Sequence, residues 1–128
     1  MMLVWFTTME YVVHLLLNEV IIKGRILMAD HRIIHSVIFT LKHAAGSSEE
    51  QVFLEDGRAI LSSIPTVQQF KVFDQVSPKN DYRFGFSMLF EDEQAYTAYN
   101  EHPLHVAFVS ERWEKEVSQF SEIDYRER

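Results

Sequence analysis

Residues 82–90 have the sequence YRFGFSMLF, in which large apolar side chains alternate with small or polar ones. Successive side chains of a β-strand point to opposite faces of a sheet, so this pattern predicts a strand with one strongly aromatic face. That aromatic face must be buried. The other face carries Gly85 and Ser87, whose small size allows another surface to approach the sheet closely.

A second strand is predicted at residues 33–42, which alternate in the same way. His35, Val37, Phe39 and Leu41 share one of its faces. This face and the aromatic face of residues 82–90 are the natural components of one core.

A helix is predicted between these strands. Ser47 followed by Glu50 forms a capping-box pattern, which places the start of the helix there and its end near Ser63. Pro65 then stops it. Gly57 lies in the middle of this helix at a cost of about 1 kcal/mol, which indicates close packing or a bend.

The second half of the chain completes the pattern. It predicts a strand at 67–76, a turn at 77–81, a helix opened by the acidic residues 91–93, a helical piece from Pro103 to about Lys115, and a strand at 120–125. The resulting order, βαββαβ, is that of an α+β ferredoxin-like domain with a four-stranded antiparallel sheet, spanning Ile33 to Tyr125.

A dimer is expected from the same pattern. Helices on one face of such a sheet leave the other face apolar and exposed, and large apolar patches are rare on monomers. Two sheets packed face to face would cover both patches, so the sequence predicts a homodimer in the form of a dimeric α+β barrel.

Residues 1–27 are expected to lie outside this domain. Glu10 and His14 interrupt their apolar runs, which argues against a membrane span, and no basic region or cleavage site indicates a secretory signal. Lys23-Gly24-Arg25 can be encoded by a purine-rich string of codons, and such a string resembles a bacterial ribosome-binding site. We therefore expect the native protein to begin at Met28, giving a domain at 28–128; an extra amphipathic helix at 10–22 is the alternative.

The composition excludes several function classes. The formal net charge is −7 and no Lys or Arg run is present, which argues against a nucleic-acid partner. The chain has no cysteine, so disulfides, thiolate metal sites and cysteine nucleophiles are excluded. A cytoplasmic location fits this composition. No motif calls for a cofactor.

Three segments resemble one known family. They are HSVIFTLK at residues 35–42, IPTV at 64–67 with Phe70 after it, and YNEHPLHVAF at 99–108. The last is the most specific, and together they are similar to the stress-responsive A/B barrel (Dabb) domain over residues 33–126. Members of this family form dimeric α+β barrels, and residues 1–27 have no counterpart in them.

The resemblance also points to a site. The family includes plant proteins linked to stress tolerance and a plant polyketide cyclase that closes its product by aldol chemistry. In that enzyme the second histidine of a His-Pro-x-His motif is the base and a nearby tyrosine assists it; the matching residues here are His105 and Tyr99. The cyclase has a further pocket histidine where this chain has Phe84, which puts the same substrate in doubt.

Two functions remain open at this stage. The first is a ligand-binding barrel without catalysis, holding a small apolar or aromatic molecule in a pocket lined by His35, Phe39, Phe84 and His102. The second is a cofactor-independent lyase with His105 as general base and Tyr99 as its assistant. Structural roles compete with both, since His102 could cap a helix and His105 could tighten the core. No carboxylate is spaced to complete a metal site with these histidines.

Overall fold

The computed structural model describes residues 31–128, and the expectations for residues 1–27 lie outside this part of the chain. Its elements are β1 (Ile33–Leu41), α2 (Ser48–Ser62), β2 (Gln68–Asp74), β3 (Phe84–Phe90), α3 (Glu93–Glu101), α4 (Pro103–Phe108), the π-helical turn η1 (Val109–Trp113), α5 (Glu114–Glu116) and β4 (Val117–Tyr125). Within these residues, no helix has the length and apolar character needed to cross a membrane.

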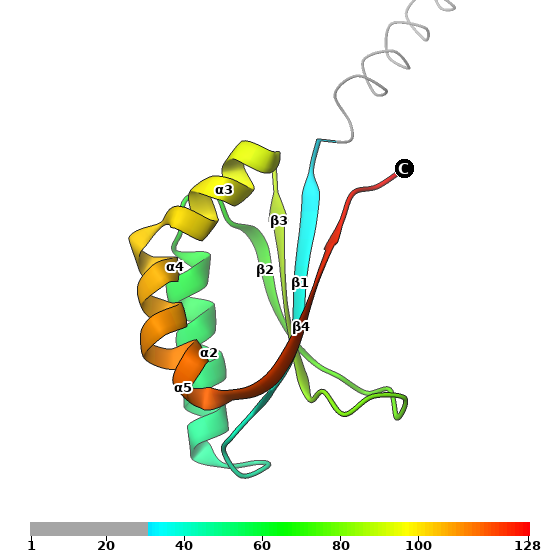
Figure 1. Cartoon of the computed structure of the whole chain (residues 1–128), viewed down its shortest axis with the longest axis vertical. Coiled ribbons are helices and arrows are strands. Elements are labelled where there is room, and N and C mark those ends of the chain that lie inside the picture. The colour runs from blue at the N-terminus through cyan, green and yellow to red at the C-terminus, as the bar shows by residue number, and fades with distance from the viewer. Residues whose placement is uncertain (1–30) are drawn as a thin grey trace, which may run out of the picture. The chain divides into compact units, whose positions relative to one another are not determined.

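The four strands form one antiparallel sheet in the order β2-β3-β1-β4. The helices all lie against one face of this sheet (Figure 1). Together the order of elements and the sheet topology confirm the predicted ferredoxin-like α+β fold.

The core lies between the helices and the inner face of β1 and β3. Phe39 and Phe86 are fully buried there, with ring centroids 4.8 Å apart in an edge-on arrangement. The predicted aromatic face of β3 is buried from Phe84 to Phe90. Tyr82 is half-exposed and precedes the strand, because the Asn80 side chain accepts a hydrogen bond from its backbone N–H at 3.0 Å and extends the turn.

Gly57 explains how closely α2 approaches the sheet. A Cβ atom at this position would lie 2.8 Å from Cζ of Phe86, closer than side chains tolerate. The glycine therefore permits the Phe86 ring to pack directly on the helix backbone, which is the close packing that the sequence indicated.

The C-terminal helix differs from the prediction of one piece from Pro103 to Lys115. A π-helical turn at Val109–Trp113 separates two α-helical parts. Such turns widen a helix by one residue and change the direction of the side chains that follow. Here the turn ends on Trp113, whose ring lies 4.9 Å from that of Phe39.

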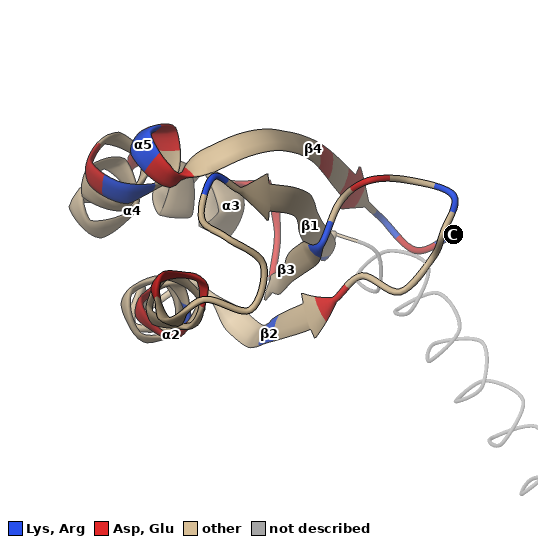
Figure 2. Cartoon of the chain, turned by 90° about the horizontal axis from the view of Figure 1, so that it is seen from below, with Lys and Arg blue, Asp and Glu red and all other residues tan. Residues whose placement is uncertain are grey.

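The outer face of the sheet is open in the single chain. Neither β1 nor β3 carries a charged residue, and Figure 2 shows charge concentrated on the helices, the edge strands and the loops. Exposed apolar side chains on this face include Ile34, Phe73, Ile123 and Tyr125. The face thus carries the exposed apolar side chains that the strand pattern predicted, together with polar residues such as Ser36, Lys71 and Ser87.

Candidate functional site

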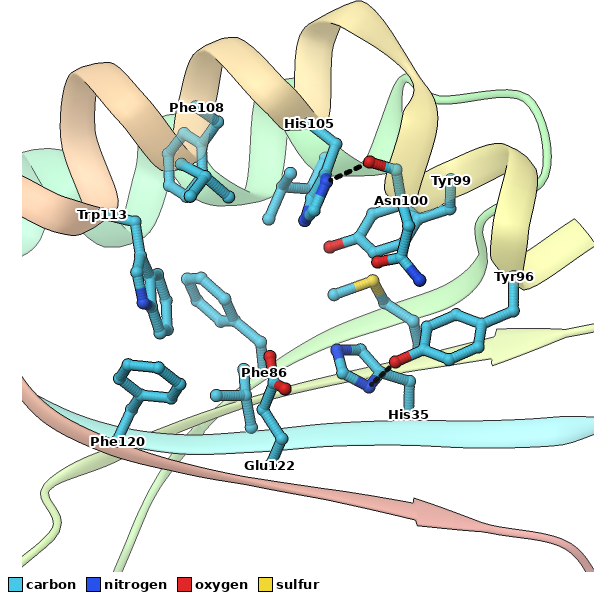
Figure 3. Close-up of a pocket in the computed structure, with 14 residues that line it drawn as sticks. His35, Phe86, Tyr96, Tyr99, Asn100, His105, Phe108, Trp113, Phe120 and Glu122 are labelled. Carbon is cyan, nitrogen blue, oxygen red and sulfur yellow. Dashed lines mark hydrogen bonds between the residues drawn. The ribbon is translucent and has the colours of Figure 1, made fainter.

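A partly open cavity of about 330 Å³ lies between the inner face of the sheet and helices α3 and α4 (Figure 3). One end is polar and the other is aromatic. The polar end holds His35, Tyr96, Tyr99, Asn100 and His105, the aromatic end holds Phe86, Phe108, Trp113 and Phe120, and Glu122 lies between them.

The helix break at His102 and Pro103 creates the polar end. Proline has no backbone N–H and disfavours helical geometry in the residue before it, so α3 ends and His102 adopts an extended conformation. The His102 side chain then caps α4, because its Nδ1 accepts a hydrogen bond from the Leu104 N–H at 3.1 Å.

This cap releases the backbone carbonyl of Asn100. In a continuous helix that carbonyl would accept from the N–H of residue 104, four positions on. Since the Leu104 N–H is bonded to His102, the Asn100 oxygen is available, and Nδ1 of His105 lies 3.0 Å from it. A carbonyl only accepts, so Nδ1 carries the proton and donates. The neutral ring therefore presents an unprotonated Nε2.

The surroundings of His105 favour its neutral form. Desolvation by burial lowers its pKa below the ordinary value of 6.5, and the hydrogen bond to Asn100 opposes this only in part. At neutral pH the side chain is thus an uncharged base, which is the state that proton abstraction requires.

Tyr99 and Tyr96 line the cavity beside the histidines. The Tyr99 ring is buried and lies 4.4 Å from the His105 ring, with its hydroxyl directed into the cavity. Burial raises the pKa of Tyr99, so its hydroxyl stays protonated and can donate. Burial and the charge of Asp124 raise the pKa of Tyr96 to about 12.

His35 is the second histidine of the site and comes from the sheet. Its ring is buried, and Nδ1 lies 2.6 Å from a carboxylate oxygen of Asp124, its neighbour across β1 and β4. The Tyr96 hydroxyl donates to the other oxygen of Asp124 at 3.1 Å. The carboxylate therefore fixes the proton on Nδ1 of His35 and leaves Nε2 for the cavity. Figure 3 shows the two histidines approaching from opposite sides.

Only some of the residues predicted for the site line the cavity. His35, Tyr99 and His105 line the cavity, whereas Phe39, Phe84 and His102 do not. Phe39 is enclosed by other core rings, Phe84 packs beside Phe39, and His102 serves as the α4 cap, the structural alternative weighed for it. Phe86 borders the cavity without filling it.

Five residues of the site were not predicted from the sequence: Tyr96, Asn100, Trp113, Glu122 and Asp124. A signal for the acidic pair was available, since Phe120, Glu122 and Asp124 alternate along one face of the last strand. Which face is the inner one depends on the pairing of β4 with β1. Asn100 acts through its backbone carbonyl, so its residue type carries no signal for this role.

The described part of the chain contains no set of side chains arranged to bind a metal ion. No group of three or more His, Asp or Glu side chains at residues 31–128 is arranged to hold one. The site is made of imidazoles, phenols, one free carboxylate and aromatic rings.

Comparison with known proteins identifies related chains. Residues 33–127 match the model of the stress responsive A/B barrel domain family. A Dabb family protein with a ferredoxin-like fold from Mesorhizobium loti is 58% identical, with a TM-score of 0.73 over 73% of this chain and 94% of that one. The family resemblance predicted from residues 35–42, 64–67 and 99–108 is confirmed. The comparison with curated proteins found no match.

More distant structures share the fold alone. A hydroxynitrile lyase from Passiflora edulis is 12% identical, with a TM-score of 0.67 over 77% of this chain and 94% of that one. A dimeric protein of unknown function from Bacteroides fragilis is 19% identical, with a TM-score of 0.59 over 76% of this chain and 97% of that one.

The protonation of His105 can be measured directly. We expect its NMR titration midpoint to lie below 6.5, because partial burial of the ring disfavours the protonated, charged form. Its ¹⁵N shifts should show the proton on Nδ1 at neutral pH, and the His105→Gln variant identifies the signal. A folded state that resists protonation loses stability as the pH falls below 6.5, so wild type should lose more stability than His105→Gln on acidification. A midpoint above 6.5 or a proton on Nε2 would contradict this.

Proposed function

We propose that this chain, which belongs to the stress-responsive A/B barrel domain family, is a homodimeric cytoplasmic protein that binds a small aromatic molecule in the cavity between its sheet and helices. The observation that carries the proposal is the division of the cavity into an aromatic end and a polar end. Binding pockets for small molecules are typically concave and mostly apolar, with a few convergent polar groups that fix orientation.

The aromatic end supplies surfaces for a ring. The Trp113 and Phe120 rings meet edge to face with centroids 5.6 Å apart, and about half of the Phe120 surface is exposed. A planar ligand packed there would cover apolar surface that the protein leaves open to water. At the other end, Nε2 of each histidine can accept and the Tyr99 hydroxyl can donate a hydrogen bond.

Binding is tested with tyrosol, a phenol with a neutral hydroxyethyl arm. Trp113 lines the cavity and reports on it, and a Trp5→Phe background removes the only other tryptophan. We expect saturable fluorescence change with a dissociation constant of about 1 mM or tighter, as the size of the probe allows. Val109→Phe, which adds a ring to the cavity wall, should weaken binding about tenfold or more because the space is filled.

Val106→Phe is the matched control for this test. Val106 lies on α4, just before the turn that contains Val109, but is exposed and does not line the cavity, so this variant should bind like wild type. Equal binding by both variants, or no saturation with wild type, would contradict a ligand site in the cavity.

A second candidate function is general-base catalysis by His105, as in a cofactor-independent lyase. It is favoured by the hydrogen bond of Nδ1 to the Asn100 carbonyl, which leaves Nε2 unprotonated beside the Tyr99 hydroxyl. A hydroxynitrile lyase shares the fold. In the proposed step Nε2 of His105 takes a proton from a carbon next to a carbonyl. The electron pair moves to the carbonyl oxygen, which the Tyr99 O–H then stabilises as an enolate.

This step predicts hydrogen–deuterium exchange. In D₂O the protein should speed the loss of the benzylic proton signal of 4-hydroxyphenylacetone by about 10²-fold or more over buffer, the usual contribution of a positioned base. His105→Gln should abolish the acceleration and Tyr99→Phe should reduce it. His43→Gln is the control, since this histidine bonds Glu116 and does not line the cavity. Exchange that survives in His105→Gln would assign the base elsewhere.

The homodimer is supported by the apolar outer face of the sheet. Phe73 and Ile123 lie on it with half and 40% of their surface exposed, on the two edge strands. A face of this kind is rarely left uncovered, and a second copy provides a surface of the same shape. The structure from Bacteroides fragilis that shares the fold is described as dimeric.

The dimer is tested by charge substitution. We expect wild type to be dimeric by light scattering, and Phe73→Lys and Ile123→Lys to shift it toward monomer, because each would bury an unpaired ammonium group in the interface. Val52→Lys is the matched control, since Val52 is 49% exposed but lies on α2, away from this face. A monomeric wild type, or dimeric Lys variants on both strands, would contradict the proposal.

A further inference from the structure

The cavity is built without a cation. Of the fourteen residues that line it, none is Lys or Arg. His105 is held in its neutral form. His35 lies 2.6 Å from the Asp124 carboxylate, so any positive charge on its ring is balanced within the protein. An anionic group entering the cavity would meet no unpaired positive charge.

Three arginines of the described domain are held in ion pairs outside the cavity. Arg83 pairs with the buried Glu50 at 3.2 Å, Arg112 pairs with Asp56 and Glu116 at 2.6 Å, and Arg126 pairs with Glu93 at 3.1 Å. Recruiting one of these three to an anionic ligand would break an existing ion pair. The Glu50 pair would be the costliest to break, since it would leave a buried carboxylate without its ion-pair partner.

Glu122 is the carboxylate of the cavity. It lies opposite Val37 in the β4–β1 pairing, which directs its side chain to the inner face, and Figure 3 shows it pointing between the two ends of the cavity. Within residues 31–128 the Glu122 side chain has neither a hydrogen-bond partner nor an ion-pair partner. The side chain of Asp124, two residues on, by contrast bonds His35 and Tyr96. A carboxylate placed in this way is available to a ligand.

The energetic consequence follows from the sign of this charge. An anionic head group would lose hydration next to a second anion, which is unfavourable. An ammonium group would form an ion pair with Glu122, and a neutral head group would have only a small desolvation cost. Because Glu122 is exposed to solvent in part, the effect is that of a screened ion pair. A ratio of about fivefold between charged and neutral heads is the size that exposed pairs give.

We infer that the cavity selects aromatic ligands with an amine or neutral head group over aromatic acids, and that Glu122 determines this preference. The inference rests on the proposed binding function and names the chemical class of its ligand. Trp113 and Phe120 would take the ring, and the head group would lie toward Glu122 and the histidines.

Three probes of matched shape test it. Tyramine, tyrosol and 4-hydroxyphenylacetate share a phenol ring on a two-carbon arm and differ in an ammonium, hydroxyl or carboxylate end. With Trp113 fluorescence in the Trp5→Phe background, we expect tyramine to bind about fivefold more tightly than tyrosol and the acid to bind more weakly than both. Added salt should reduce these ratios and leave tyrosol binding unchanged.

The role of Glu122 is tested by Glu122→Gln, which keeps the shape of the side chain and removes its charge. We expect tyramine to lose its advantage over tyrosol and the acid to gain affinity. Glu55→Gln is the matched control, because it changes the net charge equally from an exposed position on α2 that does not line the cavity. This variant should keep the wild-type order.

The outcomes distinguish a failure of the charge preference from a failure of ligand binding itself. If tyrosol binds but the acid binds as tightly as tyramine, or if Glu122→Gln leaves the ratios unchanged, the charge selection is overturned and the binding function stands. An equal loss of tyramine preference in Glu55→Gln would assign the effect to the overall charge and overturn the role of Glu122. If none of the three probes binds, both are overturned.

Discussion

The hydrogen bond from the Leu104 N–H to the His102 side chain is the contact on which the site depends. It replaces the bond that a continuous helix would make to the Asn100 carbonyl, and that carbonyl then orients His105. A helix break is usually a cost in unpaired backbone groups. Here the Leu104 N–H and the Asn100 carbonyl each bond a histidine side chain, so the break places an imidazole with a defined tautomer over the sheet.

The rest of the fold keeps space open beneath that imidazole. The aromatic side chains of β1 and β3 are buried in the interior, and α2 approaches so closely at Gly57 that the Phe86 ring packs against helix backbone. Core volume is thereby concentrated at the α2 side. The opposite side, under α3 and α4, is left with a cavity that Phe86 borders.

The ferredoxin-like order could be predicted because strand alternation, the Ser47 cap and the prolines act locally. The ends of elements were harder to predict wherever a side chain competes with the backbone, as Asn80 does before β3. The site was predictable as far as its motif extends, to Tyr99 and His105. Its other half comes from β4, and Asp124 reaches His35 only through strand pairing across 89 positions of sequence, so no local pattern contains it.

The two histidines also show how the choice of partner sets what a ring can do. A carboxylate and a backbone carbonyl both fix the proton on Nδ1, so Asp124 and Asn100 produce the same tautomer in His35 and His105. The two partners differ in charge, since Asp124 is a carboxylate and the Asn100 oxygen belongs to a neutral peptide group. With burial opposing charge at His105, the ring on α4 is suited to receive a proton from a bound molecule. With the His35 ring beside a carboxylate, His105 in its neutral form and no Lys or Arg in the lining, the cavity offers no unpaired positive charge, which agrees with a ligand whose charge, if any, is positive.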